Sequence, residues 1–302
     1  MKMVKRALGA ISMTAAAAMW SAPAAAAWTM NLRQGVTELS REIYDLHMLI
    51  LWICVAIAVA VFGVMIYSIA TFRKSKGAVP ATFEHNTKAE IIWTVIPVMI
   101  LVAMAVPAAR TLVKIDDTSG AEMTIKATGY QWKWQYDYVD EDVSFFSTLA
   151  QASNEARQLD SGVDVHKVEN YLLDVDNPLV VPVGKKVRML ITAADVIHNW
   201  WVPDFGMKKD AIPGFINELW FKADKVGTYR GQCAELCGRD HGFMPIVVRV
   251  VEQAEYDSWL ASQKAARQAA AAPAAQTAGV TTEPAAPAAT VTTTTVLVAN
   301  AE

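Results

Sequence analysis

Two cysteines, a histidine and a methionine lie within twelve residues in the C-terminal half of this 302-residue chain. The spacing is C-x3-C-x3-H-x2-M, and a second histidine lies 35 positions before the first cysteine. Thiolate, thioether and imidazole groups favour copper over hard cations, which prefer oxygen ligands. The pattern therefore predicts a copper site, with these candidate ligands: His198, Cys233, Cys237, His241 and Met244.

The number of thiols indicates which kind of copper site to expect. A mononuclear blue site uses one cysteine, two histidines and a weak axial methionine. Here Cys233 and Cys237 can bridge two copper ions and share one unpaired electron between them, which suits electron transfer. The spacing matches the binuclear centre called CuA. Glu235 lies between the cysteines, where its backbone carbonyl can reach a copper ion while its side chain points away.

A disulfide is the alternative interpretation of this cysteine pair, because an exported domain can oxidise two nearby thiols. The third cysteine, Cys54, lies in an apolar run. The histidine and methionine at ligand spacing favour the metal over the disulfide.

Composition excludes several classes of function. The chain is 53% hydrophobic with a formal net charge of -3, and it has no basic patch for nucleic acid. We find no P-loop, no glycine-rich dinucleotide motif and no G-x-S-x-G sequence. No C-x-x-C-H motif for covalent haem attachment is present. The apolar composition favours a membrane protein.

The N-terminus predicts a cleaved signal peptide over residues 1–27. Lys2, Lys5 and Arg6 precede an apolar segment, and the small residues of Ser21–Ala27 are typical of a cleavage site. An uncleaved anchor is the alternative, but the apolar segment is short and rich in alanine.

Residues 28–114 are expected to form a membrane anchor with two spanning helices, at about 49–72 and 91–112. Leu49–Phe72 and Ile91–Ala109 carry no charge, and each reaches the roughly 18–20 residues that a span needs. The segment between them has excess positive charge, which places it in the cytoplasm. Both flanks then face the periplasm.

Residues 115–262 are expected to form an exported all-β domain, a sandwich or barrel. Short β-rich runs alternate with glycine and proline turns. A polar insertion at 149–170 is expected to be helical or loop, and Glu255–Gln268 suggests a short helix. Residues 263–302, most biased from Ala269 onward, are expected to be a disordered Ala/Pro/Thr-rich tail. The expected strands are Met123–Thr128, Leu179–Val183, Lys186–Thr192, Glu218–Phe221 and Ile246–Val250.

An aromatic run at 130–138 alternates with polar residues, so strand periodicity places its aromatic side chains on one face. One interpretation is a strand that packs on the core. The other is an exposed tryptophan that accepts electrons beside an acidic docking surface, because acids follow the run and could steer a basic partner. The aromatic residues are Tyr130, Trp132, Trp134, Tyr136 and Tyr138.

Over roughly residues 30–262 the chain resembles subunit 2 of the bacterial haem–copper cytochrome c oxidases. The resemblance implies a two-helix transmembrane hairpin followed by a cupredoxin-like domain that holds CuA in the periplasm, anchored in the inner membrane. It rests on these segments: Glu90–Pro97, Gly129–Trp134, Asp195–Trp200, Asp210–Gly214 and Gly231–Cys237, followed by His241 and Met244-Pro245.

The resemblance also implies roles for individual residues. CuA would be held by His198, Cys233, the Glu235 carbonyl, Cys237, His241 and Met244. The Glu235 side chain would bind a magnesium ion shared with subunit 1. Trp132 would accept electrons from cytochrome c, and Glu90 would stand at a proton-uptake path, although its position also suits the helix dipole. The acidic docking positions would be Asp137, Asp142, Asp176 and Asp195, whereas Phe146 replaces an acid of some relatives.

The implied function is to accept electrons from cytochrome c and pass them to haem in subunit 1, where oxygen is reduced to water and protons are pumped. Haem a, haem a3 and CuB would belong to subunit 1, with subunit 3 and lipid as further partners. Two alternatives are a copper-free quinol-oxidase-type subunit, which should lack the thiols, and a nitrous-oxide-reductase-like protein. The latter needs a histidine-rich catalytic domain, and five histidines are too few.

Overall fold

The computed structural model describes residues 31–277, in two units that divide after Tyr256. The predicted signal peptide and residues 278–302 of the predicted tail lie outside the described residues.

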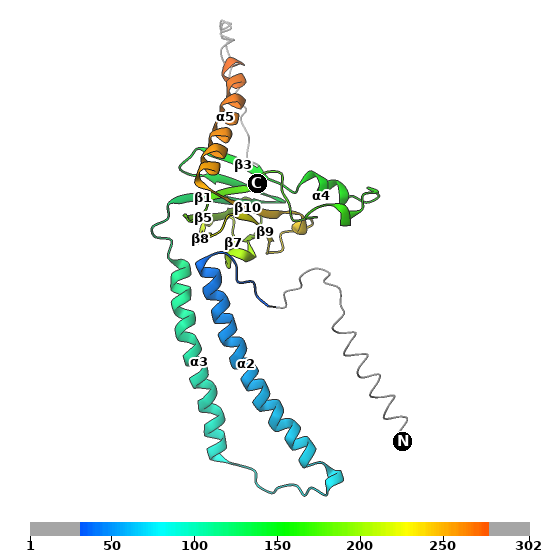
Figure 1. The fold of residues 1–302 in the computed structure, drawn as a ribbon. Coiled ribbons are helices and arrows are strands. Elements are labelled where there is room, and N and C mark those ends of the chain that lie inside the picture. The colour runs from blue at the N-terminus through cyan, green and yellow to red at the C-terminus, as the bar shows by residue number, and fades with distance from the viewer. Residues whose placement is uncertain (1–30, 278–302) are drawn as a thin grey trace, which may run out of the picture. The chain divides into compact units, whose positions relative to one another are not determined.

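Two long apolar helices precede the strands (Figure 1). Helix α2 spans Glu38–Thr71 and helix α3 spans Thr87–Asp116, joined by a loop with a short 3-10 turn, η1, at Lys74–Lys76. Each is long and apolar enough to cross a bilayer. Both helices extend beyond the charge-free segments that were expected to span the membrane, because a helix continues through turns with charged residues until it reaches its caps. Thr37 caps α2 by accepting the amide of Ser40.

The start of α2 is joined to the β-rich part of the chain. The amide of Val36 donates to the carbonyl of Asp204 at 2.8 Å, and the carbonyl of Val36 accepts from Asp224 at 2.9 Å. The Thr37 hydroxyl donates to the carbonyl of Phe205, in the 3-10 turn η3 at Pro203–Phe205. The residues that enter the first helix therefore pack on the strand domain as well as on the anchor.

Within residues 31–277, ten strands form two five-stranded sheets, which confirms the expected β-sandwich. Pairs β1–β5 and β4–β10 are parallel and the other pairs are antiparallel. The first sheet has the order β3 (Val143–Ser147), β2 (Lys133–Tyr138), β1 (Met123–Tyr130), β5 (Lys186–Ala193), β8 (Asn217–Lys222). The second has the order β4 (Leu179–Pro182), β10 (Pro245–Val251), β9 (Gly227–Cys233), β6 (His198–Trp201), β7 (Lys208–Ala211).

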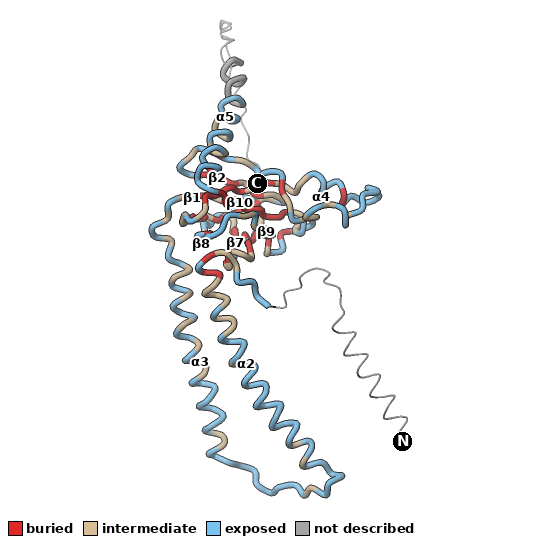
Figure 2. Tube along the Cα trace, in the orientation of Figure 1, coloured by how far each residue is buried: buried red, intermediate tan, exposed pale blue. Residues whose placement is uncertain are grey.

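Buried residues concentrate in these strands, whereas α2 and α3 are largely exposed along their length (Figure 2). Strand β5 alternates half-buried and buried residues along its whole length, as a strand with one face on the core should. Large aromatic side chains fill much of the core, and Phe205 stacks on Phe221 at 4.4 Å between ring centroids.

The aromatic run at 130–138 is not a single strand. Tyr130 pairs with Lys133 across a two-residue turn, so the chain reverses at Gln131-Trp132. Trp134, Tyr136 and Tyr138 lie on the core face of β2, as alternation predicted. The same prediction was wrong for Tyr130 and Trp132, because period-two alternation holds only within one strand.

The insertion at 149–170 contains helix α4 at Gln151–Ala156 and a 3-10 turn, η2, at Val165–Lys167, as expected. Helix α5 spans Gln253–Thr277 and corrects the predicted tail, which began at residue 263. Alanine has the highest intrinsic helix propensity, so an alanine-rich segment can extend a helix without burying apolar surface.

Candidate metal centre

Strand pairing brings the distant histidine to the cysteine loop. Trp200 of β6 pairs with Cys233, the last residue of β9. The amide of Ala234 donates to the carbonyl of Asn199 at 3.1 Å, which extends this pairing by one residue. His198 is the first residue of β6, so its imidazole lies beside the Cys233 thiol although 35 residues separate them.

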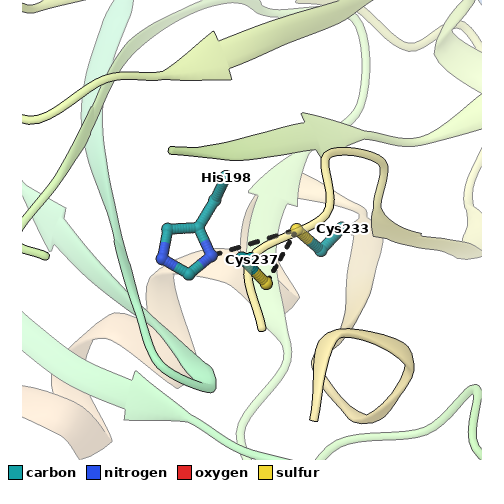
Figure 3. Close-up of side chains that lie close together, drawn as sticks. All are labelled: His198, Cys233 and Cys237. Atoms are coloured by element: carbon teal, nitrogen blue, oxygen red, sulfur yellow. Dashed lines mark hydrogen bonds between the residues drawn. The ribbon is translucent and has the colours of Figure 1, made fainter. Parts of the chain in front are cut away.

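Three of the predicted donors point toward one another at the centre of the site (Figure 3). The Sγ atom of Cys233 lies 3.9 Å from Nδ1 of His198 and 3.8 Å from Sγ of Cys237. All three donor atoms lie within 4.8 Å of one another, and all three residues are buried.

The loop between β9 and β10 supplies the other donors. A 3-10 turn, η4, at His241–Phe243 places Nδ1 of His241 3.5 Å from Sγ of Cys237. The Sδ atom of Met244, a buried residue, also lies 3.5 Å from Sγ of Cys237. The Cys233 thiol donates to the carbonyl of Glu235 at 3.3 Å, while the Glu235 residue is exposed. The structure therefore brings together all six predicted copper donors.

The donor set fits copper. Two thiols, two imidazoles and a thioether are the soft and borderline ligands that select copper over magnesium or calcium. The thiols are free rather than joined in a disulfide, so both can become thiolates. Each thiol lies beside one imidazole nitrogen, Cys233 beside Nδ1 of His198 and Cys237 beside Nδ1 of His241.

The protonation of the two thiols is unequal. Burial disfavours the Cys233 thiolate, but hydrogen bonds with His198 and with backbone groups outweigh it and hold its pKa below the ordinary value. Burial raises the pKa of the Cys237 thiol to about 12, and the nearby negative charge of Cys233 adds to the rise. A cation bound between two thiolates removes their repulsion, so metal binding should release the Cys237 proton.

Asp195 contacts the predicted ligand His198, an interaction that the sequence analysis did not predict. Its carboxylate contacts Nε2 of His198 at 2.9 Å and accepts the amides of Gln131 and Val196, each at 2.7 Å. A carboxylate on one imidazole nitrogen fixes the ring orientation and leaves the other nitrogen for a metal. Here that other nitrogen is Nδ1, which faces Cys233. The D-x-x-H spacing of Asp195 and His198 can be read from the sequence, but the spacing alone does not indicate that the carboxylate contacts the imidazole.

Gly129 lets the backbone of β1 approach the same histidine. A Cβ atom at this position would lie 2.7 Å from Cδ2 and 2.9 Å from Cγ of His198, closer than real Cβ atoms come. Sequence reasoning assigned no role to this glycine, although a glycine within a strand often marks a close approach.

Trp132 directly contacts the metal loop, which comprises residues 233–244. It lies in the turn between β1 and β2, half-buried, and its Nε1 donates to the carbonyl of Cys237 at 3.2 Å. The side chain of Gln131 donates to the same carbonyl at 2.9 Å. This turn therefore links the protein surface to the backbone of a predicted ligand.

Comparison with known proteins identifies the family. The model of "Cytochrome C oxidase subunit II, transmembrane domain" matches residues 25–110, and that of "Cytochrome C oxidase subunit II, periplasmic domain" matches residues 123–251. A probable cytochrome c oxidase subunit 2 from Rickettsia bellii is 42% identical over 237 residues, covering 78% of this chain and 84% of the relative. The chain belongs to the cytochrome c oxidase subunit II family.

A second curated relative agrees with this assignment. Cytochrome c oxidase subunit 2 of Cereibacter sphaeroides is 38% identical over 268 residues, 82% of this chain and 88% of the relative. The crystal structure of the periplasmic domain of subunit II of cytochrome oxidase from Bradyrhizobium japonicum is 49% identical, covering 49% of this chain and 96% of that one, with a TM-score of 0.43.

Family membership identifies the two long helices as the transmembrane part and the sandwich as the cupredoxin-like periplasmic domain. It also makes the chain part of a haem–copper oxidase, an oxidoreductase complex, and supports a role in accepting electrons. The His/Cys cluster of this subunit II chain agrees with copper binding.

The remaining predicted residues lie on β2, in loops of the sandwich and at the start of α3. Asp137 on β2 pairs with Lys126 at 3.2 Å, and Asp176 accepts the amide and hydroxyl of Thr148. Asp142 lies in the turn after β2 with a positive φ of 54°. Glu90 is in the first turn of α3, where its carboxylate accepts the amide of Asn86 at 3.3 Å. This position in the first turn fits the helix-dipole interpretation of Glu90.

Asp195→Asn should weaken copper binding by about tenfold to a hundredfold, because groups that orient a metal ligand typically contribute that much. The measurement is competition for copper between the purified full chain and a chelator of known affinity. Asp176→Asn, an acid that contacts Thr148 rather than a ligand, serves as the control. Unchanged copper affinity in Asp195→Asn would remove Asp195 from its role at His198.

Proposed function

We propose that this chain is the electron-accepting subunit of a bacterial terminal oxidase, receiving electrons from cytochrome c at a binuclear CuA centre. The observation that carries the proposal is the convergence of the six donors, with Cys237 within 3.8 Å of Cys233, His241 and Met244. Two facing thiols in one loop can hold two copper ions, whereas a single thiol holds one.

The residues of the chain prepare this site in three ways. When bound, the binuclear copper centre would supply a one-electron carrier whose charge is shared by two metals. Cys233 and Cys237 would supply two thiolate ligands to it from one short loop. Burial of His198, Cys233, Cys237 and Met244 excludes water from their donor atoms. The Asp195 carboxylate holds the His198 ring with Nδ1 toward the thiols.

Trp132 is the proposed point where electrons reach the site. Its indole is partly exposed, and a hydrogen bond joins it to the carbonyl of the ligand Cys237. The indole can face a partner docked on the surface. The hydrogen bond and the backbone of Cys237 then form a short route for an electron from the indole to the copper ligands. Asp137, Asp142, Asp176 and Asp195 are the proposed acids that steer a basic cytochrome, in a salt-dependent way.

We further propose that the chain crosses the bacterial inner membrane twice, with the copper domain in the periplasm. The exposed side chain of Glu235 would hold a magnesium ion shared with subunit 1, since carboxylate oxygens suit that ion. Subunit 1 would carry the haem groups and CuB, reduce oxygen and pump protons, with subunit 3 as a further partner. Glu90 is a proposed site of proton uptake.

Replacing Trp132 tests the proposed route. Trp132→Gln should slow reduction of the assembled oxidase by cytochrome c at least tenfold, because the aromatic step is lost while the copper ligands remain. Stopped-flow absorbance measures the rate. Reduction by dithionite, which needs no docking surface, is the control and should be unchanged. A normal rate with cytochrome c would exclude Trp132 from the route.

A further inference from the structure

The side chain of Arg157, in the polar insertion at 149–170, contacts the metal loop. Arg157 follows α4 directly, and its Nε donates to the side-chain oxygen of Asn154 at 2.8 Å. This bond anchors the guanidinium to its own helix. Only 23% of the side chain remains exposed.

The guanidinium of Arg157 makes two contacts with the turn that carries His241. Its central carbon lies 4.3 Å from the ring centroid of Phe243, and its terminal nitrogen lies 3.7 Å from the carboxylate of Asp240. Asp240 immediately precedes the turn η4 and Phe243 ends it. One side chain therefore holds both ends of the three-residue segment that contains His241.

The turn has few restraints of its own, although the exposed side chain of Arg239 also reaches the Asp240 carboxylate, at 3.5 Å. Two backbone hydrogen bonds close it, from the amide of Phe243 to the carbonyl of Asp240 at 2.9 Å and from His241 to Gly238 at 3.3 Å. No side-chain hydrogen bond caps its start. A cleft of about 220 Å³, lined in part by Trp132, Arg157 and Phe243, lies beside it. Packing alone therefore does not hold this side of the turn.

We propose that Arg157 is a positioning residue for the copper ligand His241, acting through Asp240 and Phe243. It holds the turn so that Nδ1 of His241 stays directed at Sγ of Cys237. Cation–π stacking and the ion pair fix the turn in two directions at once. This inference rests on the proposed function, because it gives His241 a role in copper binding.

The test compares Arg157→Ala with the wild-type full chain in detergent. In the metal-free chain, amide hydrogen exchange of His241 and Phe243 should be about tenfold faster, because the turn opens more often. In the copper-loaded chain, copper release to a chelator should also be about tenfold faster. The copper hyperfine pattern in EPR should change, because the imidazole is less well held.

Two further variants give the test its controls. Arg157→Lys keeps the charge but lacks the planar group that stacks on a ring. Its amide exchange at the turn and its copper release should therefore lie between those of the wild-type chain and those of Arg157→Ala. Arg249→Ala removes another arginine–carboxylate pair, with Glu255 at 2.7 Å, and should leave turn exchange and copper release unchanged.

The proposal would be overturned if Arg157→Ala showed the same amide exchange, the same copper release rate and the same EPR spectrum as the wild-type chain. If that variant exchanged faster throughout the sandwich, Phe243→Leu would decide. A local rise in exchange at the turn then supports the proposal, and its absence overturns it. A wild-type chain that binds fewer than two copper ions would instead contradict the proposed function, while exchange at the turn still reports whether Arg157 holds it.

Discussion

Cys237→Ser is expected to leave the chain unable to hold two copper ions. The Sγ atom of Cys237 lies within 3.8 Å of donor atoms on Cys233, His241 and Met244. A serine hydroxyl is a hard, protonated oxygen at neutral pH and does not replace a bridging thiolate. The copper content of the purified chain, measured by mass spectrometry, should fall from two ions to one or none.

Cys54→Ser is the matched control, because Cys54 lies on the apolar helix α2 rather than in the loop. It should retain two copper ions and the wild-type EPR spectrum. Two copper ions per chain in Cys237→Ser, with an unaltered spectrum, would show that the thiol of Cys237 is not a ligand.

Gly129→Ala is expected to lower both stability and copper affinity. The added methyl group would lie 2.7 Å from the His198 ring, and β1 is confined between β2 and β5, so neither side can move freely. Such overpacking typically costs about 1–3 kcal/mol of the free energy of unfolding. For a domain of this size that corresponds to a fall in melting temperature of roughly 2–12 °C. Displacing His198 should weaken copper binding at least tenfold.

Calorimetry of the metal-free chain and chelator competition measure these two effects. Gly242→Ala in the metal loop is the control, because no heavy atom lies within 4 Å of a Cβ placed there. It should change the melting temperature by much less than Gly129→Ala. Equal effects in the two variants would contradict the steric argument at His198.

The convergence of these candidate donor atoms could be predicted because most of the residues lie in one short loop. Ligand type and spacing are local properties, and Cys233, Cys237, His241 and Met244 carry both. His198 came from a distant part of the chain, and only its family resemblance and the expected sandwich connected it to the loop. The pairing of β6 with β9 supplies the physical connection.

The supporting residues could not be predicted because their roles depend on contacts between distant segments. Gly129 and Asp195 act on His198 from β1 and from the loop before β6, and Arg157 reaches η4 from α4. The residues that flank a glycine, an acid or an arginine in the sequence do not indicate which distant residue it contacts. The turn at Trp132 was missed for a similar reason, since alternation continued across it.

Hydropathy predicted the membrane spans better than the helix ends. The charge-free runs report only the part of a helix that can lie in lipid. Glu38 begins α2 because Thr37 caps it, and the alanine-rich part of α5 extends to Thr277. Capping and intrinsic propensity decide these boundaries, and neither depends on apolar burial.

Copper content and EPR of the wild-type full chain test the central claim most directly. The chain would be purified in detergent, loaded with copper and freed of excess metal. Two copper ions per chain, with a spectrum in which one unpaired electron couples to both nuclei, are expected. One copper ion with a mononuclear spectrum, or no bound copper with the thiols intact, would contradict a binuclear centre at Cys233 and Cys237.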